Sequence, residues 1–221
     1  RKRSSAASDV YKRQVDGEWQ LGVAKVEVLI IGTMTHKVYL FHIAEICKGG
    51  AEVPLALKQL LQDGTIIKVG NRIFNDINRL KGNNIELRNT LELGHMAHDR
   101  GVTPTRGPSG AKIIDALYPG VQLLGKAGED GSPRRSNWSA VPLQNDQIAY
   151  ATSDGYWPAV AYLRMTQITA PKNQTPLSKE QATDILPVTL FSRGWKGRVA
   201  EGVTRKASRS NVDVARDPFF S

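Results

Sequence analysis

The 221-residue sequence contains a single cysteine, Cys47, so no disulfide framework within the chain can hold it together. Long apolar runs are also missing, because no stretch approaches the roughly 18 residues that a membrane-spanning helix needs. The N-terminal residues are basic, and no apolar segment follows them as in a secretory signal peptide. We therefore expect an intracellular protein that does not interact with membranes, with the nucleus slightly favoured over the cytoplasm.

Acidic residues are in deficit, with 21 against 30 lysines and arginines, which gives a formal net charge of +9. Such an excess of positive charge is typical of proteins that bind polyanions, including nucleic acids. Residues 1–14 carry five basic residues and one acidic residue, a net of +4, which leaves +5 for the rest of the chain. Nearly half of the net positive charge, +4 of +9, therefore lies in this leader.

The leader has an unusual sequence. Residues 4–14, SSAASDVYKRQ, match codon by codon the translation of a transposase-based sequencing adaptor. We therefore expect residues 1–14 to be a non-native leader and exclude them from the prediction of fold and function. The authentic domain would then begin at Val15, truncated at the 5′ end of its gene. The alternative is a native basic arm that serves nuclear localisation.

The pattern of apolar residues predicts an α/β domain over residues 15–168. The runs VEVLIIGTM and KVYLFHI predict an antiparallel hairpin, and TIIKVG predicts a short buried strand. Helical spacing predicts helices in VPLALKQLLQD, NDINRLKG, TLELGHMAHDRG and SGAKIIDALYPG, and a long one from Leu143 to about Ile168. Residues 169–184 are predicted to be a polar linker, and residues 185–221 a small basic C-terminal extension.

Four acidic residues lie in positions that suit metal ligands. Asp16 and Glu18 share one face of a strand, because strand side chains alternate. Asp76 follows the strand TIIKVG at the start of a helix, the end of an α/β sheet where sites gather. Tyr150 and Asp154 are four residues apart and share a helical face. Each pair alone is more typical of a solvated surface, so the prediction of a Mg²⁺ site depends on their order and context.

In that order and context, these residues resemble the 3′–5′ exonuclease domain of the ribonuclease D superfamily, tyrosine type, and most closely the Werner-helicase-like exonucleases. The segment DGEW resembles the first exonuclease motif, KVGNRIFNDINRL the second, and RRSNWSAVPLQNDQIAYATSDGYW the third with its lead-in. The resemblance covers about residues 15–168. It implies a ribonuclease-H-like mixed sheet flanked by helices.

The resemblance also implies an activity: hydrolysis of phosphodiester bonds of DNA or RNA from a 3′ end with two divalent ions, Mg²⁺ or Mn²⁺. Asp16, Glu18 and Asp154 would hold the ion that activates the attacking water. Asp16 would also reach a second ion, through which Asp76 would act. Tyr150 would orient the water, because a tyrosine with a pKa of about 10 is a poor base at neutral pH.

Two features depart from the family pattern. The apolar strand segment expected ahead of Asp16 is replaced by the adaptor-like residues. Pro158 lies four residues after Asp154, where it removes a helix hydrogen bond to the Asp154 carbonyl, and we expect a kink there. A catalytically silent nucleic-acid-binding module of the same fold is the alternative function, which the presence of all four acidic residues disfavours.

The expected substrate is a single-stranded 3′ end, and the sequence does not choose between DNA and RNA. Trp19 and Trp138 could stack on a terminal base. Core anchoring is the more typical role for Trp138, whereas for Trp19 the sequence favours neither stacking nor core anchoring. Arg135 and its neighbour Arg134 could contact phosphates, with a solvated loop as the alternative.

Two other patterns suggest different chemistry and fall short of it. The segment GVQLLGKA nearly matches a phosphate-binding loop, but Ala127 has no hydroxyl for Mg²⁺. His95 and His98 lack the spacing of a zinc-protease helix, and we expect them to be structural or solvated. The C-terminal basic residues around Trp195 are equally consistent with an accessory nucleic-acid surface and with a basic tail.

Overall fold

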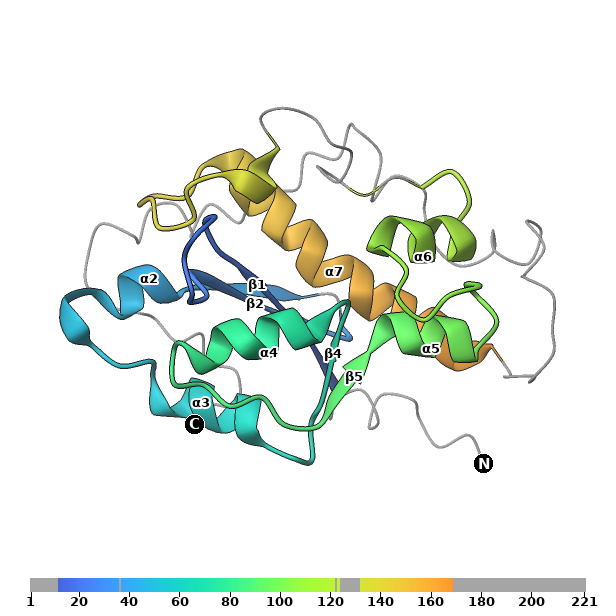
Figure 1. The fold of residues 1–221 in the computed structure, drawn as a ribbon, viewed down its shortest axis with the longest axis horizontal. Coiled ribbons are helices and arrows are strands. Elements are labelled where there is room, and N and C mark those ends of the chain that lie inside the picture. The colour runs from blue at the N-terminus through green and yellow to red at the C-terminus, as the bar shows by residue number, and fades with distance from the viewer. Residues whose placement is uncertain (1–11, 36, 122, 124–131, 169–221) are drawn as a thin grey trace.

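The structure is a computed structural model that describes residues 12–35, 37–121, 123 and 132–168. Within these ranges, strands of one mixed five-stranded sheet lie between helices (Figure 1). In the same part of the chain, no helix combines the length and the apolar character of a membrane span. The predicted linker 169–184, the extension 185–221 and most of the leader lie outside the described residues.

The sheet has the order β3-β2-β1-β4-β5. The bounds of its strands are β1 Lys12–Glu18, β2 Val28–Thr33, β3 Val38–His42, β4 Ile67–Gly70 and β5 Thr90–Glu92. The first three strands pair antiparallel, whereas β4 runs parallel to both β1 and β5. The predicted hairpin is therefore β2–β3, and the predicted buried strand is β4.

β1 begins at Lys12, three residues before the predicted start of the domain at Val15. Lys12, Arg13 and Gln14 pair with Ile67, Lys68 and Val69, and these pairs make up the whole register between β1 and β4. The adaptor-like origin of these residues stays a prediction. In the fold, however, they join the antiparallel part of the sheet to the parallel part.

The five longer helices follow the predicted segments. A short helix at Ile43–Ile46 was not predicted, and the prediction that Ile43 belongs to a strand was wrong. The bounds of the helices are α2 Ile43–Ile46, α3 Leu55–Gln62, α4 Ile73–Lys81, α5 Leu93–Asp99, α6 Gly110–Leu117 and α7 Asn145–Gln167, with short 3-10 turns η1 Lys48–Gly50 and η2 Pro133–Arg135. The prediction of a helix from Thr90 was wrong for its first three residues, which form β5 because they pair with β4. α7 continues as one helix through Pro158, and the kink expected there stays a prediction.

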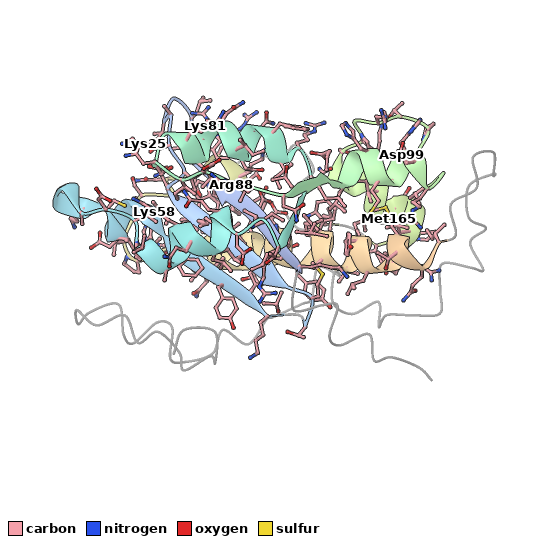
Figure 2. All side chains as sticks on the ribbon, turned by 90° about the horizontal axis from the view of Figure 1, so that it is seen from below. Lys25, Lys58, Lys81, Arg88, Asp99 and Met165 are labelled. Carbon is pink, nitrogen blue, oxygen red and sulfur yellow. The ribbon has the colours of Figure 1, made fainter. Side chains whose placement is uncertain are left out.

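Both faces of the sheet are covered by helices, which explains the unbroken apolar run of β2. Leu29 and Ile31 pack with residues of α3 and α4, whereas Val28 and Ile30 pack with Trp138 and residues of α7. A strand buried on both faces needs apolar residues at every position. The residues of α5, α6 and α7 form a further core, which includes the fully buried Met165 labelled in Figure 2.

α7 lies unusually close to β2. An ideal Cβ on Gly32 would lie 2.1 Å from the carbonyl oxygen of Gly155, and one on Gly155 would lie 2.4 Å from Val38 Cγ1. Two glycines therefore let the helix backbone approach the sheet backbone. This approach brings Asp154, the neighbour of Gly155, close to β1, the strand that carries Asp16 and Glu18.

Candidate active site

The end of β1 and the middle of α7 bring three carboxylates together. Asp16 and Glu18 come from β1, and Asp154 comes from α7. One carboxylate oxygen from each residue lies within 4.8 Å of the others, and no other such group of three occurs among the described residues. Glu18 and Asp154 are buried, with 7% and 3% of their surface exposed. Such a cluster repels itself unless a cation lies between its members.

The donor set fits a hard divalent ion. All three groups are carboxylates, which suit Mg²⁺ and Mn²⁺ and not the softer metals that prefer thiolate or imidazole. The Trp157 indole Nε1 donates a hydrogen bond to Asp154 Oδ1 at 3.2 Å, and the Gly17 backbone N–H donates to Asp16 Oδ1 at 2.8 Å. These donors help to orient the two carboxylates.

Asp76 lies beside this cluster and outside the group of three. It is buried in the first turn of α4, with 4% of its surface exposed. An ideal Cβ on Gly17 would lie 3.6 Å from Asp76 Oδ1, an ordinary contact distance, which places Asp76 beside the strand segment between Asp16 and Glu18. Burial, and then the charge of Asp16, raise the pKa of Asp76 well above its ordinary value.

Tyr150 lies one helical turn before Asp154 and is buried, with 3% of its surface exposed. Burial raises its pKa, and the negative charges of Asp154, Glu18 and Asp16 raise it further, as does a hydrogen bond with Asp154. The Tyr150 hydroxyl therefore faces the carboxylate cluster and keeps its proton. It is suited to donating a hydrogen bond and not to removing a proton.

Trp138 is fully buried, so its position supports the core role and leaves no exposed ring face for a base. Its ring centroid lies 6.2 Å from that of Tyr150 at an interplanar angle of 47°, and its carbonyl accepts a hydrogen bond from His42 Nε2 at 3.0 Å. Trp138 therefore packs against the Tyr150 ring from the core side. The prediction that Trp138 binds substrate stays a prediction.

Trp19 and Arg135 are placed differently. Trp19 is half-buried beside the core of α3 and α4, and the Arg79 guanidinium carbon lies 5.1 Å from its ring centroid. One ring face is therefore occupied by a cation. Arg135 is exposed on η2, with Arg134 exposed beside it. Its position is compatible with a phosphate contact and with a solvated loop.

Gln147 has a role that the sequence did not reveal. Its side-chain Nε2 donates to Ser136 Oγ at 2.8 Å and to the Asn137 carbonyl at 2.9 Å, and its Oε1 accepts from the Gln144 backbone N–H at 2.9 Å. It therefore ties the segment after η2 to the first turn of α7. Its spacing of three residues before Tyr150 is a signal that could have indicated this role.

The histidines that the sequence singled out are not part of this site. His95 and His98 are exposed on α5, as expected, and His98 Nδ1 lies within hydrogen-bond distance of Asp99 Oδ1, at 3.2 Å. Most of the segment GVQLLGKA lies outside the described residues.

Comparison with known proteins identifies relatives of this chain. No protein-family model matches the chain. The chain is 31% identical over 143 residues to the bifunctional 3′-5′ exonuclease/ATP-dependent helicase WRN of Mus musculus, a match that covers 64% of this chain and 10% of that protein. The chain is a relative of the 3′–5′ exonuclease domains of the ribonuclease D type. The resemblance that the motifs predicted is thus confirmed.

A second relative has the same kind of name. The chain is 24% identical over 214 residues to exonuclease 3′-5′ domain-containing protein 2 of Homo sapiens, covering 89% of this chain and 33% of that protein. The chain therefore spans about a tenth and about a third of the length of these two proteins.

The fold agrees with this relationship. A solved structure described as the apo form of the nuclease matches 75% of this chain and 77% of its own chain, with a TM-score of 0.57 and 18% identity. The predicted ribonuclease-H-like architecture, a mixed sheet flanked by helices, is confirmed.

Proposed function

We propose that the chain is a metal-dependent 3′–5′ exonuclease that hydrolyses phosphodiester bonds of DNA or RNA and releases nucleoside 5′-monophosphates. The carboxylates of Asp16, Glu18 and Asp154, gathered within 4.8 Å and largely buried, are the observation that carries this proposal. The names of the two relatives support the direction of the reaction.

Asp16, Glu18 and Asp154 would hold one divalent ion, and Asp16 with Asp76 would hold a second. Such ions lower the pKa of a bound water and neutralise the charge that develops on the scissile phosphate. The site at Asp76 is supported by its burial next to Asp16, because a buried carboxylate beside a second carboxylate favours a cation between them. Carboxylates fixed by the neighbouring donors would need little rearrangement on binding.

Tyr150 would orient the attacking water by donating a hydrogen bond. The raised pKa of Tyr150 keeps its hydroxyl protonated near neutral pH, so this side chain would not take the proton from the water. A bound ion would instead lower the pKa of the water itself. Trp138 would keep the Tyr150 ring in place from the core side.

The proposed partner is the single-stranded 3′ end of a nucleic acid in an intracellular compartment, with the nucleus slightly favoured. Arg135 would contribute an exposed positive charge to the substrate backbone. The exposed part of Trp19 would contact a base from the side that Arg79 does not cover.

Degradation of 5′-labelled DNA and RNA oligonucleotides, with Mn²⁺ or Mg²⁺ and again in excess EDTA, tests the proposal. We expect a ladder of products shortened from the 3′ end, lost in EDTA and restored by added metal. Asp16→Asn should abolish the ladder, whereas Asp115→Asn, on an exposed face of α6, should leave it unchanged. Undiminished activity in EDTA would overturn the proposal. Oligonucleotide binding without trimming would favour the silent module.

A further inference from the structure

The polar alternation of β1 extends one step before the metal ligands. Gln14, Asp16 and Glu18 occupy alternate positions and therefore share the strand face that looks toward α7. Gln14 is fully buried, and its side-chain amide makes two hydrogen bonds. Nε2 donates to the Asp154 backbone carbonyl at 3.2 Å, and Oε1 accepts from the Gly32 backbone N–H at 3.1 Å.

The Asp154 carbonyl has a special need for this donor. In an α-helix it would accept a hydrogen bond from the backbone N–H four residues later. That residue is Pro158, which has no N–H. Because a buried carbonyl without a donor is costly, a donor from outside the helix stabilises this turn. Gln14 supplies one from the strand that carries Asp16 and Glu18.

We propose that Gln14 is a positioning residue for the metal ligand Asp154. Its amide replaces the helix hydrogen bond that Pro158 removes, and it ties the ligand-bearing turn of α7 to the ligand-bearing strand. The proposal rests on the proposed metal site. Gln14 is the last residue of the adaptor-like segment 4–14, and the role belongs to the chain as it stands.

The packing around Gln14 makes this tie sensitive to change. An ideal Cβ on Gly32 would lie 3.0 Å from Gln14 Oε1 and 2.1 Å from the Gly155 carbonyl oxygen. The amide therefore fills a narrow seam between β2 and α7. An apolar side chain of similar length would fill the same space but would offer neither the donor nor the acceptor. The Asp154 turn would then be held by packing alone.

The test is a double-mutant cycle of wild type, Gln14→Met, Pro158→Ala and the double variant. Mn²⁺ binding without nucleic acid is measured from the electron paramagnetic resonance signal of free Mn²⁺, and Tm is measured in EDTA. Gln14→Met should weaken Mn²⁺ binding about tenfold, as loss of a partner that orients a ligand typically does. In the double variant, the backbone N–H that alanine brings to position 158 should restore most of the affinity.

The cycle separates the two hydrogen bonds of Gln14. Loss of the acceptor for Gly32 is common to both Gln14→Met proteins, so only the Asp154 link should respond to Pro158→Ala. Gln59→Met makes the same chemical change on an exposed position of α3 and should leave Mn²⁺ binding unchanged. If Gln14→Met does not fold, Gln14→Asn is tested in its place. The asparagine side chain is about 1.5 Å shorter, so its amide would not reach the Asp154 carbonyl.

Either of two results with the variants would overturn the proposal. Gln14→Met could lower Tm and leave Mn²⁺ affinity within twofold of wild type, which would make Gln14 a packing residue only. Alternatively, Pro158→Ala could fail to restore affinity in the Gln14→Met protein. A wild-type protein that binds Mn²⁺ but does not trim oligonucleotides would refute the proposed exonuclease activity. The double-mutant cycle would then still test the role of Gln14. Wild type that binds no Mn²⁺ would refute both.

Discussion

The two halves of β1 contribute differently to the molecule. Val15–Glu18 pairs with β2 and carries the proposed ligands Asp16 and Glu18. Residues 12–14 carry no carboxylate, yet they alone form the register with β4, and Gln14 reaches the backbone of α7. Both halves contribute to the ladder with β2, and residues 12–14 alone connect β1 to β4. The comparison teaches that a strand works as one unit, whatever the origin of its residues.

The largest effect should come from cutting β1 at different points. Deletion of residues 1–14 removes the whole β1–β4 register, so we expect loss of the cooperative thermal transition and of activity. Deletion of residues 1–11 keeps the strand intact and should change neither. Equal Tm values for the two deletions, measured by circular dichroism, would contradict the role assigned to residues 12–14.

The partner of Gln14 across the β1–β2 ladder gives the next effect. Gly32→Ala would place a Cβ 2.1 Å from the Gly155 carbonyl oxygen, a clash with backbone that cannot rotate away. We expect the free energy of unfolding, measured in urea, to fall by about 3 kcal/mol or more. Gly107→Ala, where a Cβ meets nothing within 4 Å, is the control and should be close to neutral.

Within the site, Tyr150→Phe separates orientation from binding. Loss of the hydroxyl should lower kcat about 100-fold with little change in KM or Tm, because positioned proton donors contribute at least about this much. Tyr156→Phe, in the same helix and half-buried, should leave kcat unchanged. A wild-type kcat in Tyr150→Phe would show that the hydroxyl has no part in the reaction.

The smallest effect concerns Asp76 and has the opposite sign for stability. Its pKa is raised above the ordinary 3.8, so the folded protein holds this proton more strongly than the unfolded chain does. The stability of the metal-free protein should therefore fall as the pH rises above that value. Asp76→Asn should raise Tm in EDTA at pH 7 by a few degrees and flatten its pH dependence.

Asp115→Asn, which changes an exposed carboxylate on α6, should leave both Tm and its pH dependence as in wild type. A lower Tm for Asp76→Asn in EDTA would contradict the repulsion assigned to Asp16 and Asp76.

Much of the fold follows from local patterns. The β2–β3 hairpin, α3 and α6 lie where periodicity predicts them, and Ser109 caps α6 by accepting from the Lys112 backbone N–H at 3.4 Å. β5 was missed because a three-residue strand has too little alternation to detect, and it exists through its pairing with β4. Such pairing is a tertiary effect that no local window contains.

The candidate site was predictable in its residues but not in its supports. The spacing of Asp16, Glu18 and Asp154 carried the motif, and the structure brings these side chains together. The burial of Trp138 and of Asp76 depends on packing across the sheet. Gln14 was excluded with the leader, although strand alternation from Asp16 places it on the same face.

The central claim is that the cluster of Asp16, Glu18 and Asp154 holds the metal for hydrolysis from the 3′ end. Its most direct test is single-turnover digestion of a 5′-labelled oligonucleotide with Mn²⁺ by wild type and by Asp154→Asn. The account predicts stepwise 3′ shortening with release of nucleoside 5′-monophosphates by wild type, and at least a thousandfold slower reaction by the folded variant, about 4 kcal/mol in barrier height. Equal rates for the two proteins would contradict it.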